Sequence, residues 1–379
     1  MPKIGIVTEY FYPLLGGITE NVYNSAIRLA AKGWKVKIIT SNVTDGEAKI
    51  PPKPWLGKGA HFDLIRLGRS LPVYSNGSWG RFTIGHNLIS ELQKIFREEK
   101  FDLIHIHSPL VPTLPYLTLL LARTPLVGTF HTYFDNNLFH RLFYGGLKTR
   151  LQKDLNKIGQ QLFVSQSCIT ALARYLELKP LILPNGVDTE EFSPEVPPLK
   201  KFSRDKLNLL FVGRFDPRNG LDVMLQAFSL IKAEFKEVRL IVVGGPVKKK
   251  YLEMVPPEFR KDVFFEGPVL EERPNYYATC DIFCSPVDKA SFGITLLEAM
   301  ASGKPIVATE NIGYNQLLGP EESILVARKS PQALARAVLS LLRDEALRKK
   351  MGEAGRQKAL KYSWDKIIPE LEKIYLDVL

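Results

Sequence analysis

The chain has 379 residues, of which 45% are hydrophobic and 24% are charged, and its formal net charge is +11. This composition excludes a disordered protein, and the longest apolar run, Leu114 to Ala122, is far shorter than the ~20 residues of a membrane-spanning helix. The length exceeds the roughly 250 to 300 residues at which a single core stops growing, so two domains are expected. The positive charge suits nucleic acid, anionic lipid headgroups or phosphorylated small molecules, and it does not choose among them.

The first residues run directly into a strand pattern, Lys3 to Thr8, without the charged and apolar regions of a signal peptide, so a soluble cytoplasmic protein is expected. A loop, an amphipathic helix from Ile18 to Lys32 and a strand pattern from Lys35 to Thr40 follow. This order predicts a parallel sheet. Further strand patterns lie at Phe62–Leu67, Leu103–His107, Leu126–Phe130, Leu162–Ser165 and Leu181–Leu183.

Turn residues concentrate from Pro184 onward and predict a boundary between a first domain, residues 1–187, and a second, residues 188–362. The second domain repeats the alternation, with elements expected at Leu207–Val212, Leu221–Phe235, Val238–Val243, Val263–Glu266, Asp281–Ser285, Pro305–Thr309, Pro331–Arg343 and Glu345–Lys361. A last amphipathic helix, Trp364 to Val378 within residues 363–379, is expected to cross back to the first domain. The predicted fold class is α/β, with two doubly wound Rossmann-like domains facing a cleft.

The stretch from Ser285 to Gly303 predicts the end of a strand, a polar turn and a helix from Phe292 to Ala301. Unpaired N–H groups and the positive dipole end at the start of such a helix form a site for an anion. Glu298 is the one carboxylate among the apolar residues of this helix. It is either a helix-surface charge or a contact to a ligand.

Two glycine-containing segments, one before the first helix and one after a strand pattern, are further candidate ligand sites. Gly16 and Gly17 precede the first helix, where they either relieve a tight turn or let a phosphate or sugar approach the backbone. Gly213 and Arg214 follow a strand pattern directly, and a guanidinium at a strand end suits a phosphate.

The histidines and cysteines give no metal site. His105 and His107 alternate on a strand pattern and share a face, but without a third ligand we expect a polar strand end near the cleft. Cys280 and Cys284 lack the second Cys or His pair of a zinc site, so buried thiols are expected. We expect the remaining histidines without context at the surface, namely His61, His86 and His140.

Six motifs together carry a resemblance to a known family. They are G-G-I-T-E-N-V at Gly16–Val22, H-I-H-S-P at His105–Pro109, T-F-H-T at Thr129–Thr132, P-N-G-V-D at Pro184–Asp188, F-V-G-R-F-D at Phe211–Asp216 and S-F-G-I-T-L-L-E-A-M-A-S-G at Ser291–Gly303. With them the chain resembles the retaining glycosyltransferases of family 4, which have the GT-B fold, and most closely their phosphatidylinositol mannosyltransferases. The resemblance implies transfer of a sugar from a nucleotide diphosphate sugar to a hydroxyl, with retention and without a metal or other cofactor.

The resemblance also implies roles for individual residues. As catalytic residues, His131 lies beside the donor sugar and Arg214 neutralises the diphosphate, whose charge grows as the glycosidic bond breaks. Gly17 approaches the diphosphate and sugar, the N–H groups near Phe292 to Thr295 bind the diphosphate, and Glu298 accepts hydrogen bonds from the ribose. Our donor-binding set also contains Gly16, Gly213, Arg218, Val269, Glu271, Ser291, Phe292, Gly293, Ile294 and Thr295.

Two positions depart from the family pattern. The first glutamate of the family's E-x7-E pair falls at Ala290, and the diphosphate lysine falls at Asn219. The changes remove a hydrogen-bond acceptor near the sugar and a positive charge near the leaving group. Our hypothesis is that Arg218 and Asp288, which are close in sequence, substitute for them.

The segment from Phe134 to Lys157 combines aromatic residues with cations and is the candidate acceptor side. Either it meets an anionic lipid headgroup and membrane surface, where each cation contributes about 1 kcal/mol, or its aromatics are core residues and its cations a solvated face. The residues proposed for acceptor or membrane contact are Phe139, Arg141, Phe143, Lys148 and Arg150. No nucleic-acid-binding motif is recognised, so nucleic acid is not an expected partner.

We therefore expect a retaining glycosyltransferase that moves a sugar, with mannose from GDP-mannose as the first choice, to a hydroxyl of a lipid or glycan at the inner face of the membrane. The donor base stays open, with UDP-sugars as the other candidates. The turn at Val269 either meets a flat base or is a plain turn, and Glu271 either accepts from guanine or is a helix-start glutamate. Ala290 and Asn219 keep an alternative open, a nucleotide-sugar-binding protein that has lost transfer activity and acts as a membrane-surface partner.

Overall fold

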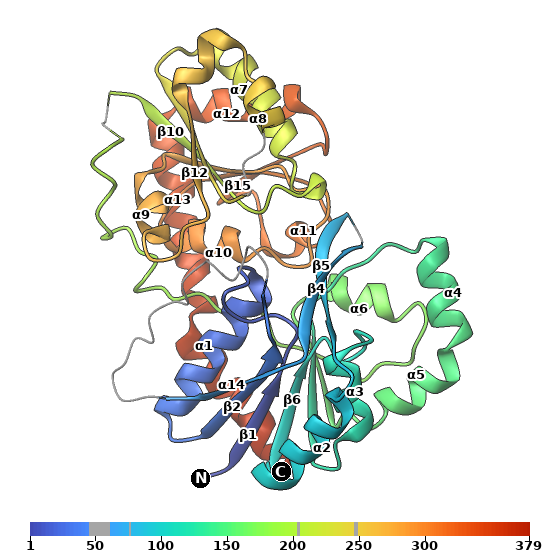
Figure 1. Cartoon of the computed structure of the whole chain (residues 1–379). Coiled ribbons are helices and arrows are strands. Elements are labelled where there is room, and N and C mark those ends of the chain that lie inside the picture. Colours follow the sequence, from blue (N-terminus) through green and yellow to red (C-terminus); the bar gives the residue numbers. More distant parts are fainter. Residues whose placement is uncertain (45–60, 76, 203–204, 246–248) are drawn as a thin grey trace. The chain divides into compact units, whose positions relative to one another are not determined.

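The computed structural model describes residues 1–44, 61–75, 77–202, 205–245 and 249–379 (Figure 1). The chain divides into two compact units. Unit 1 contains Met1–Asn185 and Trp364–Leu379, and unit 2 contains Gly186–Ser363. These divisions fall within two residues of the predicted boundaries after residues 187 and 362.

Unit 1 is built on a sheet of seven parallel strands in the order β3-β2-β1-β6-β7-β8-β9. The strands are β1 (Lys3–Val7), β2 (Lys35–Ser41), β3 (Asp63–Leu67), β6 (Leu103–His107), β7 (Leu126–Phe130), β8 (Gln160–Phe163) and β9 (Pro180–Ile182). All five residues of β6 and of β7 are buried, as expected for strands covered on both faces. The strand order reverses at β1 and β6, where ligands of doubly wound sheets bind at the carboxyl ends.

Seven helices complete the described part of unit 1: α1 (Gly17–Ala31), α2 (Leu88–Glu99), α3 (Leu114–Leu121), α4 (Leu138–Gly146), α5 (Lys148–Leu155), α6 (Gln166–Leu172) and α14 (Trp364–Val378). The C-terminal helix α14 packs beside α1 (Figure 1). Its Tyr375 ring meets Trp34 edge-on at 5.5 Å, and Glu372 accepts a 2.9 Å hydrogen bond from the Trp34 indole.

An antiparallel hairpin of β4 (Arg69–Ser75) and β5 (Ser78–Ile84) interrupts the parallel pattern, and the strand patterns did not predict it. The buried carboxylate of Glu9 fastens it to the loop after β1, since it accepts hydrogen bonds from the Thr83 N–H at 2.9 Å and from the Thr83 hydroxyl. Burial raises the pKa of Glu9, and these hydrogen bonds oppose the increase.

Unit 2 has six parallel strands in the order β12-β11-β10-β13-β14-β15. They are β10 (Leu207–Val212), β11 (Val238–Val243), β12 (Val263–Gly267), β13 (Ile282–Ser285), β14 (Ile306–Thr309) and β15 (Ser323–Val326). Numbered along the chain, this is the doubly wound order 3-2-1-4-5-6. With unit 1, it confirms the prediction of two Rossmann-like α/β domains.

The helices described in unit 2 are α7 (Leu221–Glu234), α8 (Lys249–Glu253), α9 (Arg273–Thr279), α10 (Ile294–Ala301), α11 (Tyr314–Leu317), α12 (Pro331–Arg343) and α13 (Glu345–Ala359), with short 3₁₀ segments at Pro217–Asn219, Pro257–Asp262 and Leu360–Tyr362. The Ser330 hydroxyl caps α12 by accepting from Ala333 N–H, and proline at the next position fits the first turn.

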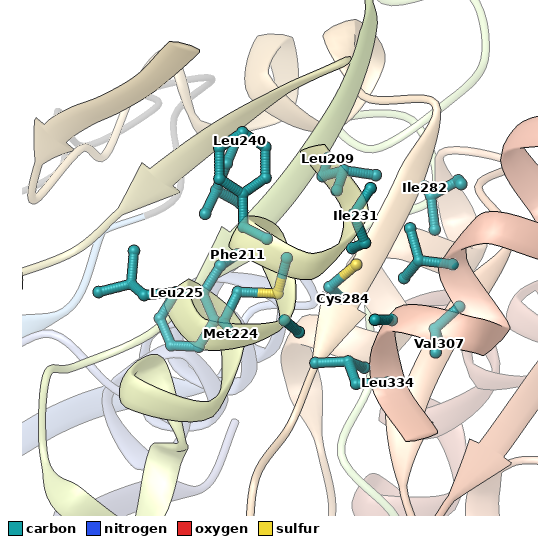
Figure 2. Close-up of a cluster of buried hydrophobic side chains, with 14 of the residues drawn as sticks. Leu209, Phe211, Met224, Leu225, Ile231, Leu240, Ile282, Cys284, Val307 and Leu334 are labelled. Atoms are coloured by element: carbon teal, nitrogen blue, oxygen red, sulfur yellow. The ribbon is translucent and has the colours of Figure 1, made fainter. Parts of the chain in front are cut away.

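The core of unit 2 lies between the sheet and the paired helices α7 and α12 (Figure 2). Leu209 and Phe211 of β10 belong to the same buried cluster as Met224 of α7 and Leu334 of α12. All four side chains are 0 to 2% exposed, and burying each stabilises the fold by about 1.5 to 3 kcal/mol. This packing holds the carboxyl end of β10, where the candidate site begins.

Candidate active site

Two loops of unit 2 meet at the carboxyl edge of its sheet. One follows β10 and carries Gly213 and Arg214, and the other follows β13, which pairs with β10 in parallel. The N–H of Asp288 in the second loop donates a 2.8 Å hydrogen bond to the Arg218 carbonyl in the first. The structure therefore brings the predicted diphosphate residues after both strands to one edge.

Arg214 is the most accessible cation of the first loop, with its side chain 43% exposed and Nη2 3.3 Å from Asp216 Oδ2. Asn219, which stands where the family has a lysine, donates through Nδ2 to the Arg214 carbonyl at 2.7 Å. Asn219 thus stabilises the backbone that carries Arg214.

Arg218 lies near the Tyr314 phenol. The Tyr314 hydroxyl is 2.7 Å from Ser285 Oγ, and burial raises the Tyr314 pKa to about 12 against the lowering effects of this hydrogen bond and of the Arg218 charge. The Arg218 carbonyl also accepts from the Asp288 N–H at 2.8 Å, so Arg218 belongs to the loops at this strand end. Its contact with an anion stays a prediction.

The helix prediction for α10 was wrong by two residues, because the helix begins at Ile294. Gly293 precedes it with φ at +116°, a backbone conformation that side chains other than glycine rarely adopt. The N–H groups of Leu296 and Leu297 bond to the Gly293 carbonyl, so the N–H groups of Ile294 and Thr295 belong to the unpaired first turn.

The residues around this turn differ in burial. Ser291, Gly293, Ile294 and Thr295 are half-buried, whereas Phe292 is 8% exposed and its ring meets Tyr362 at 6.3 Å. The Phe292 side chain is therefore part of the packing, and only its backbone is suited to an anion.

Glu298 is 3% exposed, which rules out the helix-surface alternative. Its Oε1 lies 3.0 Å from Arg273 Nη2, and its Oε2 accepts a 2.8 Å hydrogen bond from the Tyr277 hydroxyl. Burial, with the negative charge of Glu298, raises the Tyr277 pKa. Sequence reasoning missed both partners, which lie on α9.

The loop at Ala290 is held tightly. A Cβ on Gly313 would stand 2.3 Å from the Ala290 carbonyl oxygen. Asp288, the proposed substitute carboxylate, lies 3.4 Å from Arg328 Nη1 and 3.5 Å from Lys329 Nζ. Its charge is thus already paired with two cations of unit 2.

Val269 and Glu271 follow β12, which is two strands away from β10 in the sheet. Val269 is half-buried and Glu271 is exposed. Phe265 of β12 contacts Phe215 of the Arg214 loop, with their ring centroids 6.3 Å apart.

In unit 1, Gly16 and Gly17 are exposed at the start of α1. Gly16 has φ 160°, an extended conformation open to any residue, and no described atom lies within 4 Å of where its Cβ would stand. Turn relief therefore does not explain glycine at position 16, and the approach of a ligand stays a prediction. Asn21 on α1 donates a 2.8 Å hydrogen bond to Asn185 of the P-N-G-V-D motif.

Three histidines gather at the carboxyl ends of β6 and β7. His107 Nδ1 and His131 Nε2 share a 2.8 Å hydrogen bond, while His105 lies between the hydroxyls of Tyr375 at 2.6 Å and Thr129 at 2.7 Å. Burial lowers the pKa of His105 and of His131 to about 3 and that of His107 well below 6.5, so all three are neutral at pH 7.

No group of three or more His, Cys, Asp or Glu side chains in the described ranges is arranged to hold a metal ion. The three cysteines are buried and free. His61 and His86 are exposed, as predicted, whereas His140 is half-buried. The His140 ring lies 4.5 Å from that of Phe134, and partial burial lowers its pKa.

On the candidate acceptor side, the aromatic rings turn inward. Tyr144 stacks between Phe134 at 5.3 Å and Tyr175 at 5.0 Å, and burial raises the Tyr144 pKa to about 12. Phe143 is half-buried with its ring edge-on to Tyr144. The core alternative therefore holds for Phe134, which is 8% exposed, whereas Tyr144 is half-buried like Phe143. The side chain of Phe139 lies outside the described structure.

Leucines and cations cover the outer side of the same segment. The exposed fractions are 68% for Leu138, 67% for Leu142 and 44% for Leu147. Arg141, Lys148 and Arg150 are also exposed, and Arg150 pairs with Asp154 at 2.9 Å. The i, i+4 spacing of Leu138 and Leu142 was a sequence signal for this surface. No helix in the described residues is long and apolar enough to cross a membrane.

Comparison with known proteins identifies the class of protein. Residues 15–191 match the family "Glycosyltransferase Family 4", and residues 195–358 match "Glycosyl transferases group 1". With two doubly wound domains, the chain is a glycosyltransferase of the GT-B fold. It carries a domain of each of these two families, one in each half of the chain.

The similarity to curated relatives extends over nearly the whole chain. It is 28% identical over 382 residues to the phosphatidyl-myo-inositol mannosyltransferase of Mycobacterium leprae, covering 98% of this chain and 96% of that one. The enzyme of the same name from Propionibacterium freudenreichii is also 28% identical, with 98% and 94% covered.

Solved structures share the fold. A sucrose-phosphate synthase from Thermosynechococcus elongatus superposes with a TM-score of 0.78 at 21% identity, covering 100% of this chain and 99% of that one. Anabaena HepE in complex with UDP and glucose gives a TM-score of 0.73 at 17% identity, with 100% of both chains covered.

Proposed function

We propose that this enzyme transfers mannose from GDP-mannose to a hydroxyl of a phosphatidylinositol-type lipid, with retention at the anomeric carbon. The observation that carries the proposal is the 28% identity to phosphatidyl-myo-inositol mannosyltransferases over 98% of the chain. The comparisons give no support to a binding protein without transfer activity.

The leaving diphosphate is the centre of the proposed mechanism. Arg214, with Arg218 nearby, and the unpaired N–H groups at the start of α10 offer fixed positive charge and hydrogen-bond donors. Negative charge grows on the diphosphate as its bond to the anomeric carbon breaks. These groups therefore stabilise the transition state more than the bound donor.

Other residues position the donor. Gly16 and Gly17 offer bare backbone to the diphosphate and sugar, and His131 contacts the sugar. A carboxylate oxygen accepts more than one hydrogen bond, so Glu298 accepts from the ribose hydroxyls while Arg273 and Tyr277 hold it.

In this mechanism the protein supplies the positive charge, so we propose that transfer needs no metal or other cofactor. Activity after EDTA treatment and gel filtration is expected to equal that of untreated enzyme. Loss of activity that Mg²⁺ or Mn²⁺ restores would contradict this.

The outer surface of α4 and α5 is the proposed membrane contact. Its three leucines, Leu138, Leu142 and Leu147, suit the interface, and its cations, Arg141, Lys148 and Arg150, suit acidic headgroups at the inner face of the cytoplasmic membrane. Vesicle flotation with and without acidic phospholipid tests it. A variant with Leu138→Ser and Leu142→Ser should float less than one with Leu230→Ser, which changes an exposed leucine of α7.

The reaction is tested with GDP-mannose, UDP-glucose and ADP-glucose, each with phosphatidylinositol vesicles, while release of nucleotide and formation of glycolipid are followed. We expect turnover with GDP-mannose and an α-linked product. Turnover only with another donor would overturn the choice of GDP-mannose, and binding without nucleotide release for every donor and acceptor would overturn the transfer proposal.

A further inference from the structure

The hydrogen bond between His107 and His131 holds a single proton. Both rings are neutral, and the 2.8 Å contact joins His107 Nδ1 to His131 Nε2. Either His107 donates through Nδ1, or His131 donates through Nε2. In the described part of the chain, His131 makes no hydrogen bond through its other ring nitrogen, Nδ1, which is left for a ligand.

The surroundings of His107 distinguish the two arrangements. Its Nε2 is buried and has no hydrogen-bond partner among the described residues. If His131 donated, the proton of His107 would sit on Nε2 as a buried N–H without an acceptor. If His107 donates through Nδ1, Nε2 is a bare acceptor. Buried unpaired N–H groups are rarer than incompletely paired acceptors, so donation by His107 is favoured.

We propose that His107 is a positioning residue that fixes His131 as the tautomer protonated on Nδ1. His131 then presents a hydrogen-bond donor to an oxygen of the donor sugar. This inference rests on the proposed function for the sugar contact alone, because the tautomer is a property of the unliganded protein.

The packing around His107 holds this arrangement in place. The His107 ring is 1% exposed and lies 4.3 Å from the His105 ring, which is itself fixed between Tyr375 of α14 and Thr129 of β7. The low pKa of each ring keeps all three imidazoles neutral at pH 7. The Nδ1 proton of His131 is therefore present without the ring taking up a second proton.

The first test reads the tautomer directly. Long-range ¹H–¹⁵N spectra of the full-length, unliganded enzyme with ¹⁵N-labelled histidine distinguish protonated from bare ring nitrogens. The His131 signals are assigned by their loss in His131→Asn. We expect a protonated Nδ1 and a bare Nε2 in His131, and the reverse pattern would overturn the proposal.

The second test compares His107→Asn with His107→Leu, two side chains of nearly the same shape. The asparagine amide can donate to His131 Nε2 in place of the imidazole, whereas leucine neither donates nor accepts and leaves the tautomer of His131 unfixed. We expect His107→Asn to keep the wild-type tautomer and kcat within about threefold, and His107→Leu to lower kcat by about tenfold or more.

The outcomes separate this inference from the proposed function. Wild-type turnover together with the wild-type tautomer in His107→Leu would overturn the positioning role. If the wild-type enzyme is inactive with every donor, the proposed function fails, while the spectra still decide the tautomer. If His107→Leu does not fold, the wild-type spectrum and His107→Asn decide it.

Discussion

Arg273 Nη2 lies 3.0 Å from Glu298 Oε1, and the two side chains are 14% and 4% exposed. The carboxylate that the family pattern assigns to the ribose is therefore held by a buried ion pair before any donor binds. A side chain that is already held in place loses little conformational entropy when it binds a ligand. Its position depends on α9 as well as on its own helix.

Arg273→Met is expected to lower the free energy of unfolding by about 3 to 5 kcal/mol, because it leaves the Glu298 charge buried without its cation. Donor affinity should fall as well, since the carboxylate is then free to turn or to take up a proton. Urea unfolding and GDP titration measure the two effects.

A matched control is Arg343→Met, which breaks an ion pair to Glu234 whose side chains are 57% and 59% exposed. It should change stability by less than about 1 kcal/mol. Equal changes in the free energy of unfolding for the two substitutions would show that the buried Arg273–Glu298 pair stabilises the protein no more than an exposed pair does.

Gly16→Ala separates ligand approach from folding. The position has space for a Cβ and an extended backbone, and the weaker helix cap of alanine is offset by the lower entropy of its unfolded chain. We expect a change in stability below about 1 kcal/mol with a KM for the donor at least about tenfold higher. An unchanged KM would argue against approach of the donor to Gly16.

Gly313→Ala should have a structural effect instead. The new Cβ would stand 2.3 Å from the Ala290 oxygen, so the loop after β13 has to shift. Both the melting temperature and donor affinity are expected to fall, by about 1 to 3 kcal/mol in stability. Wild-type stability would show that this loop adapts freely.

Arg218→Ala tests whether Arg218 substitutes for the family lysine that is Asn219 here. Removing a charge that lies near Tyr314 should weaken GDP binding by about tenfold, or about 1.4 kcal/mol. Arg260→Ala removes a cation from the segment Pro257–Asp262 and serves as the control. Unchanged GDP affinity and turnover in Arg218→Ala would exclude the substitution.

Buried apolar runs made much of the fold predictable. The bounds of β6, β7, β10, β11, α12 and α14 agree with their predicted ranges, because continuous apolar strands and amphipathic helices leave a strong local pattern. The hairpin β4–β5 was missed, although Asn76-Gly77 is a dipeptide that favours hairpin turns.

The contacts of the candidate site were less accessible to sequence reasoning. Glu298 meets Arg273 and Tyr277 through the packing of α9 on α10, and His131 meets His107 through the pairing of β6 with β7. Such contacts join residues 21 to 25 positions apart, beyond any helical or strand period. Sequence patterns place these residues on or beside their helices and strands, but they do not identify the residues that each one contacts.

The buried histidines should make the fold sensitive to acid. The pKa of His105 is about 3 in the folded chain against its ordinary value of 6.5, so between these values the unfolded chain binds the additional proton. Its contribution is fully present above pH 6.5 and falls by about 1.4 kcal/mol for each pH unit below it. His131 behaves in the same way.

His105→Gln removes one such group and should reduce the loss of stability with falling pH by up to about 1.4 kcal/mol per unit between pH 6 and 4. His86→Gln, at an exposed position, should leave the slope unchanged. Urea unfolding at several pH values measures both. Parallel slopes for wild type and His105→Gln would mean that His105 takes up its proton in the folded protein as readily as in the unfolded chain.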